Sequence, residues 1–219
     1  MHIQKREQTL FDNVTPVTVT SSVDATPIIV TATAHGFSTG DRVLIYGHTT
    51  NIAANGIFKI TKLTADTFSL QDEFTGVNVT TTGGGAGSGG IAVKAPPIIL
   101  LSEFRNIILQ VNTSGTATTT LKVAGSLGNP ASSYSKGPRY DFPNIGATVS
   151  PSNPYSFLSI INLALDGSTI QAATGIVASG ADINNQYEVN VNAQKYLTVF
   201  PVTWSQGAIT VKAILVTNA

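Results

Sequence analysis

Two of the three histidines, His35 and His48, flank a short apolar run at residues 42–46 and have the clearest capacity for chemistry. Two imidazoles that meet across a sheet could begin a zinc site, but such sites need three or four ligands at a recognisable spacing. The chain has no cysteine, and no third ligand of matching character follows the pair. Each histidine also adjoins a glycine, which is typical of turns. The pattern favours structural histidines and predicts no metal site.

The carboxylates and serines are not arranged for catalysis either. Asp72 and Glu73 are neighbours, so on a strand they face opposite sides and cannot act as a pair. Residues Asp182–Gln186 offer hard oxygens of the kind calcium prefers but lack the acidic loop of a calcium hand. There is no nucleophile elbow around a serine, and the glycine-rich segment lacks the lysine of a phosphate loop. We therefore expect no enzymatic activity and no cofactor.

The charge balance narrows the classes of partner. Twelve basic and twelve acidic residues cancel, and charged residues make up only 11% of the chain. This gives no electrostatic basis for binding nucleic acid or an anionic membrane. The first residues are charged where a signal peptide needs an apolar core, and no run approaches the roughly 18 apolar residues of a membrane span. We expect a protein made in the cytosol, with neither nucleic acid nor membrane as partner.

Strand patterns dominate the chain, and sustained helical periodicity is missing. Short runs rich in β-branched residues alternate with Gly, Pro, Asn and Asp, which predicts an all-β fold built as an antiparallel sandwich or barrel. The expected strands are Val17–Thr20, Ile28–Ala32, Arg42–Tyr46, Gly56–Thr61, Phe68–Leu70, Asn106–Val111, Thr118–Val123, Phe157–Asn162, Tyr187–Val191, Tyr196–Phe200 and Ala208–Val216.

Composition divides the chain into modules. Residues 81–90 read TTGGGAGSGG, and so many glycines lose too much backbone entropy to form a strand, so we expect a linker or a solvated hairpin tip. This places a small β-barrel module at residues 22–95 and a β-sandwich, jelly-roll or immunoglobulin-like, at residues 96–219. Residues 1–21 are an N-terminal arm or the first strand of that sandwich. The small module is then inserted into the sandwich, or precedes it in tandem.

Contacts with other proteins are expected from the arm and from a long proline-rich loop. The loop at residues 127–154 bears aromatic side chains, and a loop of this length in a compact domain usually packs on something. The single tryptophan either anchors a partner or covers the edge of its own core. The candidate contact residues are Leu10, Phe11, Tyr134, Tyr140, Phe142, Tyr155 and Trp204.

Three segments of the first module follow a recognisable order: AHGFSTGDRVLIYG at Ala34–Gly47, NGIFKIT at Asn55–Thr61 and DTFSL at Asp66–Leu70. They resemble a small β module of phage virion proteins, named for its likeness to the first catalytic-cysteine half-domain of ubiquitin-activating enzymes. The resemblance implies a barrel-like scaffold without activity. As geometry, glycines at tight turns would separate strands that share one core face. That face is Val43, Ile45, Phe58, Ile60, Phe68 and Leu70.

The second module is also similar to phage structural proteins. The similar segments are QTLFDNV at Gln8–Val14, NIILQVNTSG at Asn106–Gly115, LKVAGS at Leu121–Ser126, NPY at Asn153–Tyr155, YEVNVN at Tyr187–Asn192 and GAITVKA at Gly207–Ala213. The first of these fits the usual start of such a sandwich, which favours an inserted small module.

Together the resemblances imply a capsid decoration or cement protein of a tailed bacteriophage, located in the virion. Its partners would be the major capsid protein and copies of itself, as a homotrimer, and deletion of residues 1–13 would abolish shell binding. A tail or neck component, tube-associated or for fibre attachment, is the alternative. A third class is a carbohydrate-binding virion module that uses Tyr134, Tyr140 and Trp204 as a stacking platform for a host-surface glycan.

Overall fold

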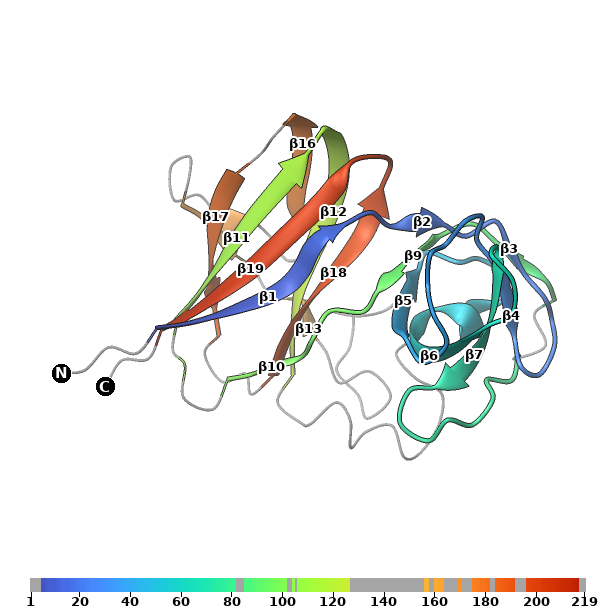
Figure 1. Ribbon diagram of the computed structural model, residues 1–219. Coiled ribbons are helices and arrows are strands. Elements are labelled where there is room, and N and C mark those ends of the chain that lie inside the picture. Colours follow the sequence, from blue (N-terminus) through green and yellow to red (C-terminus); the bar gives the residue numbers. More distant parts are fainter. Residues whose placement is uncertain are drawn as a thin grey trace. The chain divides into compact units, whose positions relative to one another are not determined.

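The computed structural model is all-β, with antiparallel pairing between every pair of neighbouring strands that it describes (Figure 1). It describes residues 5–81, 85–101, 104, 106–126, 156–157, 160–163, 169–170, 175–181, 184–191 and 196–216. Within these ranges the only helix is a single 3-10 turn, η1 (Ile52–Ala54). The predicted all-β fold class is confirmed.

The described chain forms two compact units, and the division is discontinuous in sequence. Residues 5–15 belong with the described residues from Pro96 onward in a large unit, and the described residues of Pro16–Ala95 form a small unit. The predicted boundary after residue 21 therefore moves to between Thr15 and Pro16. The reason is strand pairing, because β2 (Val17–Thr18) and β3 (Ser21–Ser22) pair only with strands of the small unit among the described residues.

The large unit contains two antiparallel sheets, consistent with a β-sandwich. The first has the order β1 (Lys5–Val14), β19 (Ala208–Val216), β11 (Asn106–Ser114), β17 (Asn184–Asn190), β14 (Ile160–Asn162) and β15 (Thr169–Ile170). The second has the order β10 (Ile99–Leu100), β18 (Tyr196–Trp204), β12 (Thr116–Ser126) and β13 (Ser156–Phe157), and β16 (Ile176–Ala181) also pairs with β12.

Strict alternation forms the core of this unit. Every second residue of β11 and β19 is buried, including Leu109, Val111 and Val211, and the intervening positions carry mostly polar residues such as Gln110 and Lys212. Successive side chains of a strand point to opposite faces, so the buried residues of each strand share one face. The sheet therefore has one buried face and one partly exposed face.

Strand β1 joins this sheet by pairing with β19, so the two ends of the described chain are neighbours. The pairing register shifts between Thr9 and Phe11 and again between Phe11 and Val14. A bulge lets consecutive side chains escape strict alternation, and here both Leu10 and Phe11 are buried. The segment is thus a core strand of the large unit and not a free arm.

The small unit is one eight-stranded sheet around its own core. Its order is β2, β9 (Ile91–Lys94), β5 (Arg42–Tyr46), β6 (Gly56–Lys62), β7 (Thr67–Asp72), β4 (Ile29–Thr31), β3 and β8 (Gly87–Ser88). No closed barrel is found among the described residues, which corrects the expected barrel. The sheet nevertheless curls, because β2 and β3 are consecutive in the chain, as are β8 and β9. Val19 also donates a backbone hydrogen bond of 2.9 Å to the Gly90 carbonyl oxygen.

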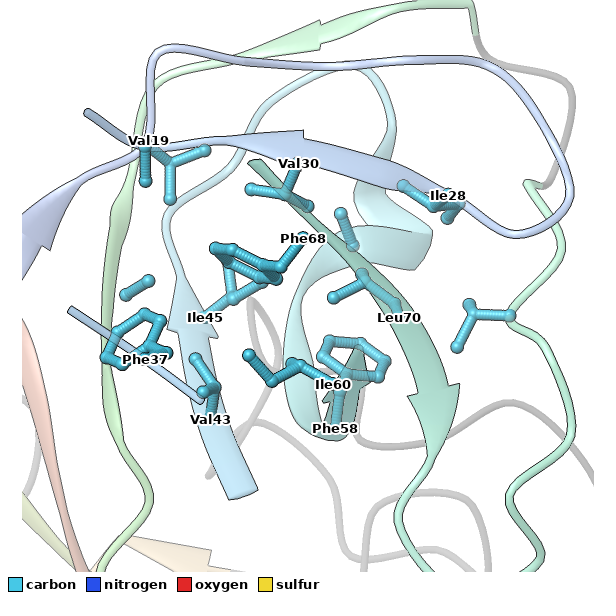
Figure 2. Close-up of a cluster of buried hydrophobic side chains, with 14 residues drawn as sticks. Val19, Ile28, Val30, Phe37, Val43, Ile45, Phe58, Ile60, Phe68 and Leu70 are labelled. Atoms are coloured by element: carbon cyan, nitrogen blue, oxygen red, sulfur yellow. The ribbon is translucent and has the colours of Figure 1, made fainter. Parts of the chain in front are cut away.

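Figure 2 shows the core that this curled sheet encloses. All six residues of the predicted core face lie in it: Val43, Ile45, Phe58, Ile60, Phe68 and Leu70. Strand β5 is buried on both faces, because Leu44 points the other way from Val43 and Ile45 and is also buried. A continuous apolar run is what a strand covered on both sides requires.

The glycine-rich segment departs from its prediction where the structure describes it. Gly87 and Ser88 form strand β8, which pairs with β3, and Gly87 is buried. The backbone-entropy cost of glycine is outweighed here because only a residue without a side chain can pass so close to other backbone. A Cβ on Gly87 would lie 2.6 Å from the Thr49 carbonyl oxygen. Glycine is needed here for space, not for an unusual φ angle.

Candidate functional site

The described residues with the greatest chemical capacity form a buried polar network around His48. This histidine directly follows the Gly47 turn at the end of β5, and the residue is 3% exposed. Its Nδ1 lies 2.7 Å from the Gly89 carbonyl oxygen and its Nε2 lies 2.8 Å from Ser22 Oγ. The ring therefore connects three segments that are far apart in sequence, from β3, from the end of β5 and from the bend between β8 and β9.

These partners determine the tautomer of His48. A carbonyl oxygen can only accept, so Nδ1 carries the proton and donates it to Gly89. Nε2 is then the acceptor for the Ser22 hydroxyl, and that oxygen also accepts a hydrogen bond of 3.1 Å from Asn51 Nδ2. Burial lowers the pKa of His48, and the hydrogen bond to Gly89 opposes this only in part. Burial therefore favours the neutral form of the imidazole.

Asn55 holds the backbone of His48 as a neighbouring strand would. Its Oδ1 accepts a hydrogen bond of 2.8 Å from the His48 amide, and its Nδ2 donates one of 2.7 Å to the His48 carbonyl oxygen. The same Nδ2 lies 3.4 Å from the carbonyl oxygen of Ile52 in η1. Asn55 is itself buried. All described hydrogen bonds of this side chain are thus made inside the small unit.

The contact between Ser22 and His48 has the distance of a nucleophile and its general base. Two features argue against that use. Ser22 is 2% exposed, so a substrate has no access to its hydroxyl. Nδ1 faces a backbone carbonyl where an activating carboxylate would stand. The arrangement fastens strands together and is not a catalytic pair.

His35 is separate from this network and packs among aromatic rings. Its ring centroid lies 5.2 Å from that of Phe37 and 5.0 Å from that of Phe68, and its Nδ1 accepts a hydrogen bond from the Phe37 amide. In the described part of the chain no group of three His, Cys, Asp or Glu residues could hold a metal ion. The structural interpretation of His35 and His48 agrees with their surroundings.

The aspartates of the same stretch support turns. Asp66 accepts a hydrogen bond of 2.7 Å from the Ala34 amide, and Asp41 accepts one of 2.9 Å from the Ser38 amide. Burial by itself raises the pKa of Asp41. The Ser38 amide and the Lys94 ammonium, 3.0 Å away, outweigh burial and lower that pKa below its ordinary value.

An ion pair closes the other end of β5. Arg42 donates from Nε to Glu73 Oε2 at 2.8 Å and from Nη2 to the same oxygen at 2.6 Å. The Glu73 side chain is 1% exposed, whereas that of Arg42 is 38% exposed. Asp72, the residue before Glu73, uses its own carboxylate to cap the following turn through the Phe74 and Thr75 amides. The two neighbouring carboxylates serve different local structures.

The structure places the predicted contact residues in different environments. Leu10 and Phe11 are 5% and 2% exposed, so they cannot contact a partner while the large unit is folded, and this assignment is corrected. Trp204 is partly buried, and its indole N–H donates a hydrogen bond of 3.0 Å to the Gly207 carbonyl oxygen in its own turn. That contact supports the interpretation in which the tryptophan covers its own unit. Tyr134, Tyr140, Phe142 and Tyr155 lie outside the described residues, as do Asp182 and Ile183 of the calcium hypothesis.

Exposed apolar side chains were missed by the sequence analysis. On the large unit they are Leu100, Leu163 and Val177, and on the small unit they are Val23, Ile52, Leu63, Phe74 and Val77. The sequence does not show that Val177 is exposed, because a β-branched residue fits a strand whichever face of the sheet it occupies. Only the register of β16 against β12, which pairs Val177 with Thr120, reveals its outward direction.

The fold and the network define an all-β protein with two units and a histidine-centred structural network in the smaller one. No family model matched the chain, and no curated protein matched it. No helix in the described ranges has the length and apolar character needed to span a membrane.

Proposed function

We propose that the protein is a structural component of a tailed-phage virion, a decoration or cement protein that binds the outer surface of the capsid and stabilises it. The proposal is supported by the polar contacts within the segment that resembles the phage module. Its histidines and aspartates are used to hold its own turns and strands, as His35, His48, Asp41 and Asp66 illustrate. Polar side chains that bind their own turns and strands suit a scaffold module.

The mechanism is mechanical. Many symmetry-related copies add apolar contacts and strand-edge pairing between neighbouring capsid proteins, which raises the barrier to rupture of the shell. A surface with only 11% charged residues is poorly protected against association, and burial against neighbours suits it. The partners are the major capsid protein and two further copies of this chain in a trimer.

Because Leu10 and Phe11 are buried, other residues must contact the shell. Val177 in β16 of the large unit and Ile52 in η1 of the small unit are each 56% exposed, more than any other large apolar side chain that lies in a described strand or helix. We assign one of these two surfaces to the shell. Because the two residues belong to different units, one substitution in each distinguishes the surfaces.

Particle binding by Val177→Asp and Ile52→Asp tests that assignment. Each change adds a charge at an exposed position, so the free energy of unfolding falls by no more than about 1 kcal/mol, which is the range of strand propensities. Binding to capsids that lack the protein is measured by co-sedimentation. Loss in one variant alone assigns the surface, and full binding by both removes these residues from the contact.

Copy number in purified particles tests the function itself. A number that matches the capsid lattice, with density on the outer shell in a cryo-EM map, is the expected result. A number far below the lattice count, with density at the tail or neck, favours the alternative of a tube-associated or fibre-attachment protein. Absence of the protein from the particles overturns both. A glycan array with wild type and Trp204→Ala checks the carbohydrate-binding class, which predicts binding that is lost in the variant.

A further inference from the structure

Asn55 is followed by Gly56, and this Asn–Gly pair occurs once in the chain. A glycine lacks the Cβ that shields a backbone nitrogen. The side-chain carbonyl carbon of an asparagine before glycine is therefore open to attack by the backbone nitrogen of that glycine. We propose that Asn55 is a site of spontaneous deamidation that the folded small unit suppresses, so that loss of the amide records opening of this unit.

The chemistry requires only water. The Gly56 backbone nitrogen attacks Asn55 Cγ, a nitrogen–carbon bond forms, and the bond between Cγ and Nδ2 breaks. Nδ2 leaves as ammonia and takes the proton that the attacking nitrogen loses. Water then opens the five-membered imide at one of its two carbonyl carbons and gives aspartate or isoaspartate. One water enters and one ammonia leaves, with no change of oxidation state.

The folded structure opposes the first step in three ways. The Asn55 amide is held by both backbone groups of His48, at 2.8 Å and 2.7 Å, so Cγ cannot turn toward Gly56. The backbone of Asn55 is extended, with φ of −83° and ψ of 131°. Ring closure needs Cβ and the Gly56 nitrogen nearly eclipsed about the Cα–C bond, which this ψ does not allow. Gly56 is in addition paired with Ile45 in the sheet.

The product does not fit the folded site. An aspartate at position 55 has no N–H to donate to the His48 carbonyl oxygen, and its charge would stand at a position that is 3% exposed. A buried charge and an unsatisfied carbonyl both disfavour the folded state. Isoaspartate also inserts an extra backbone carbon immediately before β6. Each deamidation therefore marks an opening event and makes reclosure less favourable.

Tryptic peptide mapping of the full chain tests the site. Cleavage after Arg42 and Lys59 releases residues 43–59, which contain both Asn55 and Asn51. Asn51 precedes isoleucine, whose branched side chain shields the backbone nitrogen, so it is an internal control within the same peptide. The protein is incubated at neutral pH in buffer and in denaturing urea, and isoaspartate and aspartate at each position are measured by mass spectrometry.

We expect rapid conversion of Asn55 in urea, little conversion of Asn51, and a rate in buffer at least about a hundredfold slower, as opening of a stable unit implies. Rates at Asn55 that agree within a few-fold in buffer and in urea overturn the protection. Absence of conversion in urea overturns the site.

Ser22→Ala and Ser21→Ala provide a matched pair of variants. Ser22 donates to His48 Nε2, whereas its neighbour Ser21 is exposed. Ser22→Ala should raise the rate at Asn55 in buffer at least about tenfold and leave the rate in urea unchanged, and Ser21→Ala should change neither. Should Ser22→Ala not fold, wild type in sub-denaturing urea replaces it, and the rate at Asn55 must then rise in parallel with hydrogen exchange of β5 and β6. A flat rate refutes the link to opening.

Discussion

Gly87→Ala is the sharpest test of the histidine network, because it adds a single methyl group. The new Cβ would overlap His48 Nε2 and lie 2.6 Å from the Thr49 carbonyl oxygen. Gly87 has no positive φ, so the cost is steric and not conformational. Overpacking of this kind costs about 1–3 kcal/mol. Displacing the ring also leaves the buried Ser22 hydroxyl without the acceptor for its proton, which adds about 1–3 kcal/mol. We expect a loss of about 2–6 kcal/mol in the free energy of opening the small unit.

Hydrogen exchange followed by mass spectrometry on the full chain measures this loss, because it reports peptides of the small unit and of the large unit separately. Exchange in β3, β5 and β8 should accelerate, while exchange in β11 and β19 stays as in wild type. Gly36→Ala is the matched control. Its Cβ would meet nothing within 4 Å, but its φ of +69° is unfavourable for alanine, so it isolates a backbone cost of about 1–2 kcal/mol.

A second control removes the ring. In the double variant His48→Ala with Gly87→Ala, part of the overlap is gone, so the two effects should be less than additive. The clash with the Thr49 carbonyl oxygen remains in the double variant, and the relief is therefore partial. If Gly87→Ala opens no more readily than Gly36→Ala, the close approach of β8 to His48 is not what holds this part of the small unit together.

Three further predictions concern acid, an ion pair and the first strand. Because the pKa of His48 is lowered in the fold, the contribution of His48 to the stability of the small unit is complete above the unfolded pKa of about 6.5 and is lost as the pH falls through the folded pKa. Hydrogen exchange in the small unit should accelerate as the pH falls over that window. An NMR titration in which the His48 ring protonates at an unshifted pKa contradicts this prediction. Because the pKa of Asp41 is lowered, its contribution to stability is present above about pH 3.8 and is lost as the pH falls through the folded pKa. Since Lys94 is largely exposed, Asp41→Asn should lower the free energy of unfolding by no more than about 1 kcal/mol in a urea titration at neutral pH. A larger loss means that the carboxylate has a further role. Phe11→Ala should destabilise the large unit by about 3–5 kcal/mol, measured by Trp204 fluorescence in urea, and a change below about 1 kcal/mol would show that β1 is not part of the core.

Local patterns in the sequence identified most strands and the core of the small unit, because their information lies within a few residues. Val43, Ile45, Phe58 and Ile60 alternate strictly, and alternation alone assigns them to one face. The turn roles of the aspartates were predictable for the same reason, since a short carboxylate caps amides two or three residues away, as Asp41 does for Ser38.

The candidate site could not be predicted in the same way, because its partners are distant in sequence. His48 contacts Ser22, 26 residues away, and Gly89, 41 residues away. Neither residue type suggests a histidine partner, and Gly89 contributes only its backbone. Strand β8 was missed for a related reason. Gly87 is needed because other backbone lies close to it, and a sequence shows which residues are small but not which of them are crowded.

The N-terminal strand changes how an arm deletion must be interpreted. Removal of residues 1–13 takes away most of β1, which pairs with β19 from Lys5 to Val14 and buries Leu10 and Phe11. Losing two buried side chains of this size costs several kcal/mol, comparable to the whole stability of many domains. A deletion variant that fails to bind capsids would therefore report unfolding as readily as a lost contact. Substitutions at exposed positions, such as Val177→Asp, leave β1 in place and separate the two causes.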